Sequence, residues 1–317
     1  MSYQPTKTKY SGSIKEVKIG VGDKAVTVGG KTCYSFYLFE GEMPNPPKIA
    51  GEIWDMDPGD EWSPADREPF KDVLGDSAAW AKKWIDEYGA ELIAIQCKSS
   101  DPNGADRPAD EVAEVVKKVA DAIDVPLIVW GTANHDKDVE VLRKVAELCE
   151  GKRVVLGPTE EGDYKQIGAA ALGYQHVVGA STPIDVNLAK QLNILLENLG
   201  VQMENIIMDP TTGGLGYGLE YTYSVMERMN MAALVQQDDK LQLPIFCNMA
   251  QEVWKTKEAK ISVDEAPQLG KQEERGILME AVTAVDLLIA GADIVVIRHP
   301  KTASLVKKFI EDMMSKE

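Results

Sequence analysis

The stretch LLENLGVQMENIIMDP, residues 195–210, contains one complete change from helix to strand. Its leucines continue an apolar stripe with helical spacing that begins at Leu188. Gly200 stands where a helix commonly ends in the left-handed conformation. After a turn, the apolar run 205–209 is typical of a buried strand. The same order recurs at YGAEL, AIDVPL and AGADI, so the sequence predicts short connections from helix to strand.

Short strand-like runs of this kind alternate with amphipathic helical segments from residue 49 onward, which is typical of a parallel sheet with helical crossovers. There are eight of these runs: 49–55, 92–98, 126–130, 153–157, 176–180, 205–209, 244–248 and 293–298. Eight such units over about 250 residues is the size of a closed (β/α)8 barrel. We therefore predict an α/β fold, a TIM barrel over residues 49–317.

Two segments do not fit the repeat. In residues 1–48, GSIKEVKIG and KAVTVGGKTCYSFYLFE are typical of a β-hairpin, and the proline-rich EMPNPPK of a linker. We expect this N-terminal extension to be a lid over the N-terminal mouth of the barrel or an arm toward a partner. The charged segment 250–272, which includes Trp254, follows the seventh strand and is our candidate for partner docking, since loops of that length are usually functional or mobile.

Charge and cysteine content exclude several classes of protein. With 34 Lys and Arg against 51 Asp and Glu, the net charge of −17 would repel nucleic acid and an anionic membrane surface. No stretch approaches the roughly 20 apolar residues needed to span a bilayer. The cysteines are far apart, and none forms the C-x-x-C pair of a zinc or iron–sulfur site. We expect buried thiols in a reducing cytoplasm at Cys33, Cys97, Cys149 and Cys247.

In a barrel, the loops after the strands build the functional face. After the sixth strand, DPTTGGLGYG carries glycines at 213, 214, 216 and 218, a spacing that does not match a dinucleotide-binding loop. One interpretation is bare backbone that a flat or bulky ligand approaches closely. The other is a tight structural turn. The residues leave both open.

Polar residues at the strand ends are the candidate ligand contacts. Asp185 in STPIDVN is also a typical helix N-cap, which is compatible with a place at the mouth. The three histidines lie on different units without short metal-ligand spacing, so no metal site is predicted. Of these histidines, His299 at a strand end is the one expected to face a ligand, with Arg298 beside it.

Four stretches together resemble a known family: DPTTGGLGYGLEYTYSVMER, STPIDVNLAKQLNILLENL, FEGEMPNPPKIAGEIWD and DEYGAELIAIQCKSSDP. They are similar to the small subunit of the corrinoid iron–sulfur protein, called the delta subunit in the archaeal acetyl-CoA decarbonylase/synthase system. The similarity covers nearly the whole chain. It implies a barrel of the dihydropteroate-synthase-like kind.

The resemblance also implies a function. In that family a large subunit carries a 4Fe–4S cluster and a corrinoid domain, and the small subunit's barrel caps the cobamide. The heterodimer receives a methyl group from methyltetrahydrofolate through a separate methyltransferase and passes it to acetyl-CoA synthase, in the reductive acetyl-CoA pathway. We therefore expect a methyl-carrier subunit that is not catalytic alone. Its expected cobamide-facing residues are Asp209, Thr211, Thr212, Gly213, Gly214, Gly216, Ser181, Asp185, Asn187, Asn248 and His299.

A chain that binds a corrinoid on its own is expected to carry a D-x-H-x-x-G signature, which supplies the lower axial histidine. The nearest string is YQHVVG, which has Tyr174 in place of the aspartate, and we interpret it as coincidence. Related folate-using methyltransferases hold the pterin with Asp and Asn at strand ends, as Asp209 and Asn248, or Asp185 and Asn187, would do here. A stand-alone pterin-dependent corrinoid methyltransferase is therefore the alternative, and a barrel enzyme of unknown substrate is a weaker third.

Overall fold

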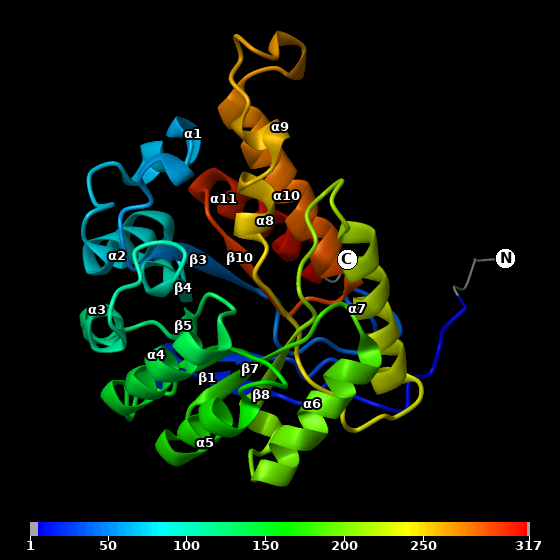
Figure 1. The fold of residues 1–317 in the computed structure, drawn as a ribbon. Coiled ribbons are helices and arrows are strands. Elements are labelled where there is room, and N and C mark those ends of the chain that lie inside the picture. The colour runs from blue at the N-terminus through cyan, green and yellow to red at the C-terminus, as the bar shows by residue number, and fades with distance from the viewer. Residues whose placement is uncertain (1–5, 316–317) are drawn as a thin grey trace, which may run out of the picture.

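The computed structural model describes residues 6–315 of the chain. Eight parallel strands form one sheet in the order β8-β7-β6-β5-β4-β3-β10-β9 (Figure 1). A parallel bridge between Met208 and Ile245 joins the two edges and closes the barrel. The strands are β3 (Lys48–Trp54), β4 (Ile93–Gln96), β5 (Leu127–Trp130), β6 (Val155–Thr159), β7 (Val177–Ser181), β8 (Ile206–Asp209), β9 (Phe246–Cys247) and β10 (Ile294–Ile297). The predicted TIM barrel and all eight predicted strands are confirmed.

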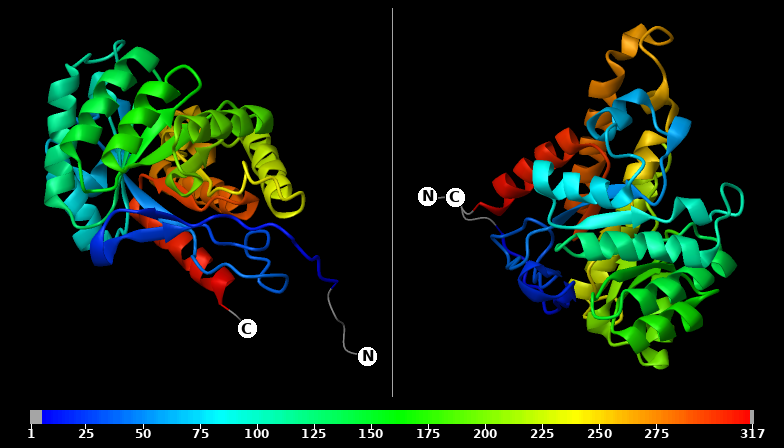
Figure 2. Two further views of the ribbon diagram at one scale, coloured as in Figure 1. Left: turned by 90° about the horizontal axis from the view of Figure 1, so that it is seen from below. Right: turned by 90° about the vertical axis from the view of Figure 1, so that its left-hand side faces the viewer.

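Long helices surround the sheet, one after each strand (Figures 1 and 2). They are α2 (Ser77–Tyr88), α3 (Ala109–Ala122), α4 (His135–Leu148), α5 (Tyr164–Tyr174), α6 (Val186–Leu199), α7 (Leu219–Leu234), α10 (Gln272–Ala290) and α11 (Pro300–Met314). Shorter helices lie in the loops: α1 (Pro64–Arg67), α8 (Ala250–Trp254) and α9 (Lys257–Lys260). Within residues 6–315, no helix combines the length and apolar composition needed to cross a membrane.

The N-terminal hairpin covers the N-terminal mouth of the barrel. Strands β1 (Val17–Ile19) and β2 (Val26–Val28) pair antiparallel, with Val17 opposite Val28. Their apolar side chains are buried and belong to the same cluster as the inward-facing residues of the barrel strands. Of the two roles expected for the N-terminal extension, a lid or an arm toward a partner, the lid describes this hairpin. The four cysteines are buried and free, as predicted.

A buried ion pair stands beside the seam where the barrel closes. The backbone N–H of Ile245 donates to Asp293 Oδ2 at 2.9 Å, which ties the start of β9 to the start of β10. Lys31 Nζ donates to the same oxygen at 3.3 Å and to the carbonyl of Gly291 at 2.7 Å. Lys31 and Asp293 are 1% and 3% exposed, so each needs the other as its compensating charge. The N-terminal extension is thereby fastened to the last strand.

Replacing Lys31 by Met should leave the Asp293 carboxylate buried without its cation. We expect the free energy of unfolding, measured by urea denaturation, to fall by about 3–5 kcal/mol. The double variant Lys31→Met/Asp293→Asn should recover part of that loss, because the unpaired charge is then gone. Lys190→Met removes a partly exposed ion pair with Asp238, at the surface of the molecule, and should cost only about 0–1 kcal/mol. Equal losses for Lys31→Met and Lys190→Met would contradict a special role for the buried pair.

Candidate functional site

The structure brings Ser181, Asp209 and Thr211 together at the C-terminal mouth of the barrel. Ser181 ends β7, Asp209 ends β8, and the two are opposite each other in the parallel register. Ser181 Oγ donates to Asp209 Oδ2 at 2.8 Å, and the N–H of Thr211 donates to Asp209 Oδ1 at 3.1 Å. These contacts form because neighbouring parallel strands end at the same edge of the sheet.

Asp209 is only 6% exposed, and burial raises its pKa to about 7. The hydrogen bonds from Ser181 and Thr211 act in the opposite direction, and the nearby charge of Glu160 adds to the increase. Burial has the largest effect because it penalises the charged form of a carboxyl group. Asp209 therefore gains or loses a proton close to neutral pH.

Two threonine hydroxyls at this mouth have no strong partner among the described residues. Thr182 and Thr212 are 5% and 6% exposed, and neither Oγ1 atom makes a hydrogen bond. Thr212 lies close enough to the Cys247 thiol to lower that group's pKa, but a thiol is a weak partner. Buried polar atoms are almost always paired, so these two mark a place where a water or a ligand group is expected.

Thr211 adopts a backbone conformation that is uncommon for a branched residue. Its φ angle is 59°, in the left-handed region. Such a conformation costs of the order of 1–3 kcal/mol and persists where surrounding contacts enforce it. Here Thr211 Oγ1 donates to the carbonyl of Thr182 at 2.9 Å, in addition to the N–H contact with Asp209. The strain lies beside the candidate site.

The glycine-rich loop forms a tight turn. A Cβ atom on Gly213 would lie 2.6 Å from the backbone of Gly218, so no larger residue fits there without a shift. Gly218 has a φ of 105° and is the N-cap of α7. The N–H of Tyr217 donates to the carbonyl of Gly214 at 2.8 Å. The interpretation as a tight turn thus accounts for the glycines of this loop. Contact of Gly213, Gly214 and Gly216 with a ligand stays a prediction.

Asn248, after β9, pairs with a residue that the sequence reasoning missed. Gln96 Nε2 donates to Asn248 Oδ1 at 2.8 Å, and Asn248 Nδ2 donates to Gln96 Oε1 at 3.2 Å. Gln96 ends β4 and is completely buried. The two strands are not neighbours in the sheet, so the amide pair spans the mouth. A polar residue at the end of the apolar run IAIQ was the available signal.

Asp185 and Asn187 lie on the rim, outside this hydrogen-bonded group. Asp185 accepts from the N–H groups of Asn187 at 2.7 Å and Leu188 at 3.0 Å, so the predicted N-cap of α6 is confirmed. Asn187 is exposed. Asp185 ends the loop that follows Ser181 and Asn187 lies in the first turn of α6, but neither contacts the Asp209 group through a hydrogen bond in the described structure.

His299 is enclosed, although it follows the barrel strand β10 closely. It is 2% exposed, and its ring stacks on that of Trp254 with the two ring centres 6.0 Å apart. As the N-cap of α11, its Nδ1 accepts a hydrogen bond from the N–H of Lys301 at 3.2 Å. Burial lowers its pKa to about 4, so it is neutral at pH 7. It therefore has less access to a ligand than Ser181, Asp209 or Thr212. Trp254 is itself 1% exposed, so this tryptophan of segment 250–272 belongs to the core.

Arg298 belongs to a buried ionic network. Its Nε donates to Glu52 Oε2 at 2.6 Å and its Nη1 donates to Asp66 Oδ2 at 3.1 Å. The guanidinium lies 4.0 Å from the centre of the Trp62 ring. Glu280 accepts from the N–H of Arg298 at 2.7 Å, and burial raises its pKa to about 7. These partners are more than 200 residues from Arg298 or lie on another element, so no local sequence pattern indicates them.

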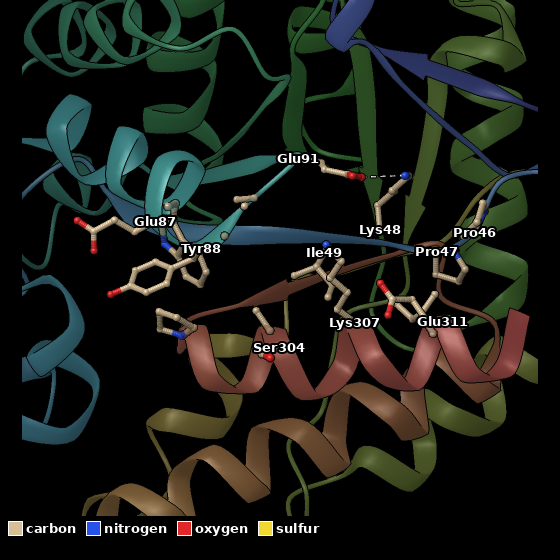
Figure 3. A pocket seen from close by; sticks show the side chains of 17 residues that line it. Pro46, Pro47, Lys48, Ile49, Glu87, Tyr88, Glu91, Ser304, Lys307 and Glu311 are labelled. Carbon is tan, nitrogen blue, oxygen red and sulfur yellow. Dashed lines mark hydrogen bonds and ion pairs between the residues drawn. The ribbon is translucent and has the colours of Figure 1, made fainter. Parts of the chain in front are cut away.

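A groove of about 530 Å³ lies on the outside of the barrel, between α2 and α11 (Figure 3). Its floor includes Ile49 at the start of β3, and the ion pair of Lys48 and Glu91 lies at its edge. These residues are at the N-terminal ends of the strands. The groove is therefore separate from the mouth that holds Asp209.

Comparison with known proteins gives two kinds of match. Residues 16–309 match the model of a family described as the CO dehydrogenase/acetyl-CoA synthase delta subunit. The chain is 35% identical to the acetyl-CoA decarbonylase/synthase complex subunit delta of Archaeoglobus fulgidus, over 99% of this chain and 71% of the relative. It is 37% identical to the subunit of the same name from Methanopyrus kandleri, over 95% and 76%.

Among solved structures, dihydropteroate synthases have similar folds. The enzyme of Xanthomonas albilineans gives a TM-score of 0.60 at 13% identity, with coverage of 95% of this chain and 100% of the other. The enzyme of Vibrio fischeri gives 0.59 at 13% identity, with coverage of 90% and 99%. At this identity the likeness shows the fold alone. It confirms the dihydropteroate-synthase-like barrel expected from the resemblance.

Asp209→Asn should change how stability depends on pH. The folded pKa of Asp209, about 7, lies above its ordinary value of 3.8, so the folded protein holds this proton more tightly than the unfolded chain. Wild-type stability should therefore fall, relative to the variant, as pH rises from about 4 to about 7, by up to a few kcal/mol. Urea denaturation from pH 4.5 to 8 measures this difference. Parallel curves for the two proteins would contradict the raised pKa, and the surface change Asp124→Asn should leave the wild-type curve unaltered.

Proposed function

The chain belongs to the family of CO dehydrogenase/acetyl-CoA synthase delta subunits, and from that premise we propose that it caps the cobamide of a corrinoid iron–sulfur protein. In this proposal a larger subunit carries the cobamide and a 4Fe–4S cluster. The pair receives a methyl group from methyltetrahydrofolate through a methyltransferase and delivers it to acetyl-CoA synthase. The observation that carries the proposal is the family match over residues 16–309.

The cysteines and histidines of the chain support this division of labour. All four cysteines are buried and free, and none is paired in a C-x-x-C motif. His176 is 1% exposed and its Nε2 contacts the carbonyl of Ala146 at 2.9 Å, while His299 is buried as a helix cap. Neither of these two imidazoles is open to bind cobalt, and the third, the exposed His135, is held by Asp163, whose Oδ2 lies 2.8 Å from its Nδ1. We therefore assign the cluster and any protein ligand of the cobalt to the partner.

The polar groups at the mouth are of the kind that a large cofactor with a polar edge would contact. A corrin ring carries amide side chains around its edge, and such groups both donate and accept hydrogen bonds. Thr182 and Thr212 offer buried hydroxyls without strong partners, and Asp209 with Asn248 adds groups that donate or accept. These are the contacts expected for a ligand that is held by its periphery. Bound there, a cobamide supplies the cobalt that carries the methyl group.

The residues of the chain would hold and shield the cofactor. The packed barrel below the mouth excludes water from one face of the ring, which protects a reactive metal centre from side reactions. The pKa of Asp209 is about 7, so at neutral pH its carboxyl group can donate a hydrogen bond when protonated or accept one when ionised. No residue of this chain needs to act as a nucleophile in this scheme.

The alternative is a stand-alone pterin-dependent methyltransferase. It is favoured by the dihydropteroate-synthase-like barrel, since one similar structure from Xanthomonas albilineans is described as a complex with 7,8-dihydropteroate. Asp209 and Asn248 would hold the pterin in this case. The alternative needs a group that activates the methyl donor. The partner-subunit proposal needs none.

Thr182→Val should separate binding from stability. It removes a buried hydroxyl that has no partner in the free chain, so the thermal unfolding temperature should stay equal or rise. In the complex with the large subunit, loss of one hydrogen bond to the cobamide of about 1 kcal/mol should lower methyl-transfer rate or corrinoid retention roughly fivefold. Thr222→Val is the matched control, because Thr222 Oγ1 bonds Gly213 and Thr211 and its loss should lower stability. Unchanged transfer and retention in Thr182→Val would contradict a cobamide contact there.

Titration calorimetry with methyltetrahydrofolate should show no micromolar binding to the isolated chain, because the proposal places the pterin on the methyltransferase. The same titration with the variants Asp209→Ala and Asn248→Ala tests the alternative. Micromolar binding by the wild type that both changes abolish would overturn the partner-subunit proposal in favour of the enzyme.

A further inference from the structure

The outward side of α10 is apolar along most of its length. Leu278, Val282 and Ile289 are 57%, 48% and 43% exposed, and Val285 between them is half-buried. On a helix of 3.6 residues per turn these four lie opposite the side that packs on the barrel, where Glu280, Thr283, Ala284 and Leu287 are buried. A surface helix usually carries polar residues on this side. In α10 the outward side is instead apolar over residues 278–289.

The spacing of the four residues is that of a helix-packing seam. Positions 278, 282, 285 and 289 follow one another at intervals of four, three and four residues, the pattern of the apolar positions in a coiled coil. Arg275, three residues before Leu278, occupies the preceding position of the same row and ends its apolar part, whereas Asp286 lies to the side. A second helix laid along α10 would therefore meet an apolar row over residues 278–289.

Neighbouring segments extend this surface at both flanks. Tyr37 and Phe39 are 47% and 46% exposed and their rings lie 5.4 Å apart. Their loop is held at the end of α10, because Lys31 Nζ bonds the carbonyl of Gly291 and Phe36 packs on Phe309 of α11. On α11, Leu305 is 48% exposed. We define the α10 face as Leu278, Val282, Val285, Ile289, Tyr37, Phe39 and Leu305.

The α10 face is as large as the largest apolar patches that single chains leave in water. Its side chains together expose on the order of 600 Å², which is at the upper end for the largest apolar patch of a monomer. A stable protein interface covers about 800 Å² of each partner. With a polar rim, the α10 face has the size and character of the centre of such an interface.

We propose that the α10 face binds an apolar helical surface of the cobamide-bearing subunit, an inference that rests on the proposed function. The helix α10 begins at the loop that follows β9, on the side of the C-terminal mouth, and lies between α7 and α11 (Figure 1). A chain seated along it can reach over the mouth that holds Asp209. The net charge of −17 opposes pairing with a second copy and favours a partner of lower acidity.

Co-expression with the corrinoid- and 4Fe–4S-bearing subunit of the same organism tests the proposal. Val282→Glu places a charge in the middle of the seam and should weaken pairing at least 100-fold, read by native mass spectrometry and by the corrinoid absorbance that co-purifies. Val282→Ala, a milder change, should weaken it severalfold. Leu172→Glu is the control, since Leu172 is an exposed residue on α5, 42% accessible, and should pair as the wild type does. Circular dichroism checks that each variant is folded.

The outcomes separate this inference from the proposed function. If both Val282 variants pair like the wild type, the α10 face is not the interface, while the complex itself still supports the function. If the wild-type chain does not pair with the corrinoid-bearing subunit at all, the proposed function fails and the inference fails with it. If the wild-type chain alone sediments as a dimer and Val282→Glu as a monomer, without effect on the heteromeric complex, a second copy occupies the face and the inference is overturned.

Discussion

Closure of the barrel through a short seam is the constraint on which the structure depends. Strand β9 has two residues, and the sheet closes between β8 and β9 by one bridge at Met208 and Ile245. The carboxylate of Asp293 holds the N–H of Ile245 and the ammonium of Lys31 in the same place. The seam is therefore secured by side chains where backbone pairing is shortest. Without closure, two strand edges would be buried with unpaired backbone groups, which is costly.

A closed barrel gives the molecule two different ends. At the N-terminal end, the hairpin buries apolar side chains against the barrel interior and leaves this mouth filled. At the C-terminal end, the strands finish in polar residues that bond one another across β4, β7, β8 and β9. Since the first end is occupied by the chain itself, the proposed ligand contacts are confined to the second.

The buried charged groups around Arg298 and the buried carboxyl group of Asp209 have different tasks. Arg298 with Glu52 and Asp66 is a fully paired network beneath aromatic rings and joins three separate elements of the barrel. Such a network favours one arrangement of the elements and leaves no group free for a ligand. Among residues 6–315, Asp209 is buried without a cation, and its hydroxyl neighbours Thr182 and Thr212 lack strong partners. Incomplete pairing is what distinguishes the candidate site from the structural network.

The sequence by itself determined the barrel, the eight strands, the cap at Asp185 and the end of α6 at Gly200, because these follow from periodicity and local backbone preferences within a few residues. It also placed Ser181 and Asp209 at one edge of the sheet. Tertiary structure alone decided which polar side chains are paired, enclosed or left free. Gln96 meets Asn248 across 152 residues, and His299 is covered by Trp254. Such contacts join elements far apart in the chain, so no local pattern encodes them, and only the closed fold sets their burial and pKa values.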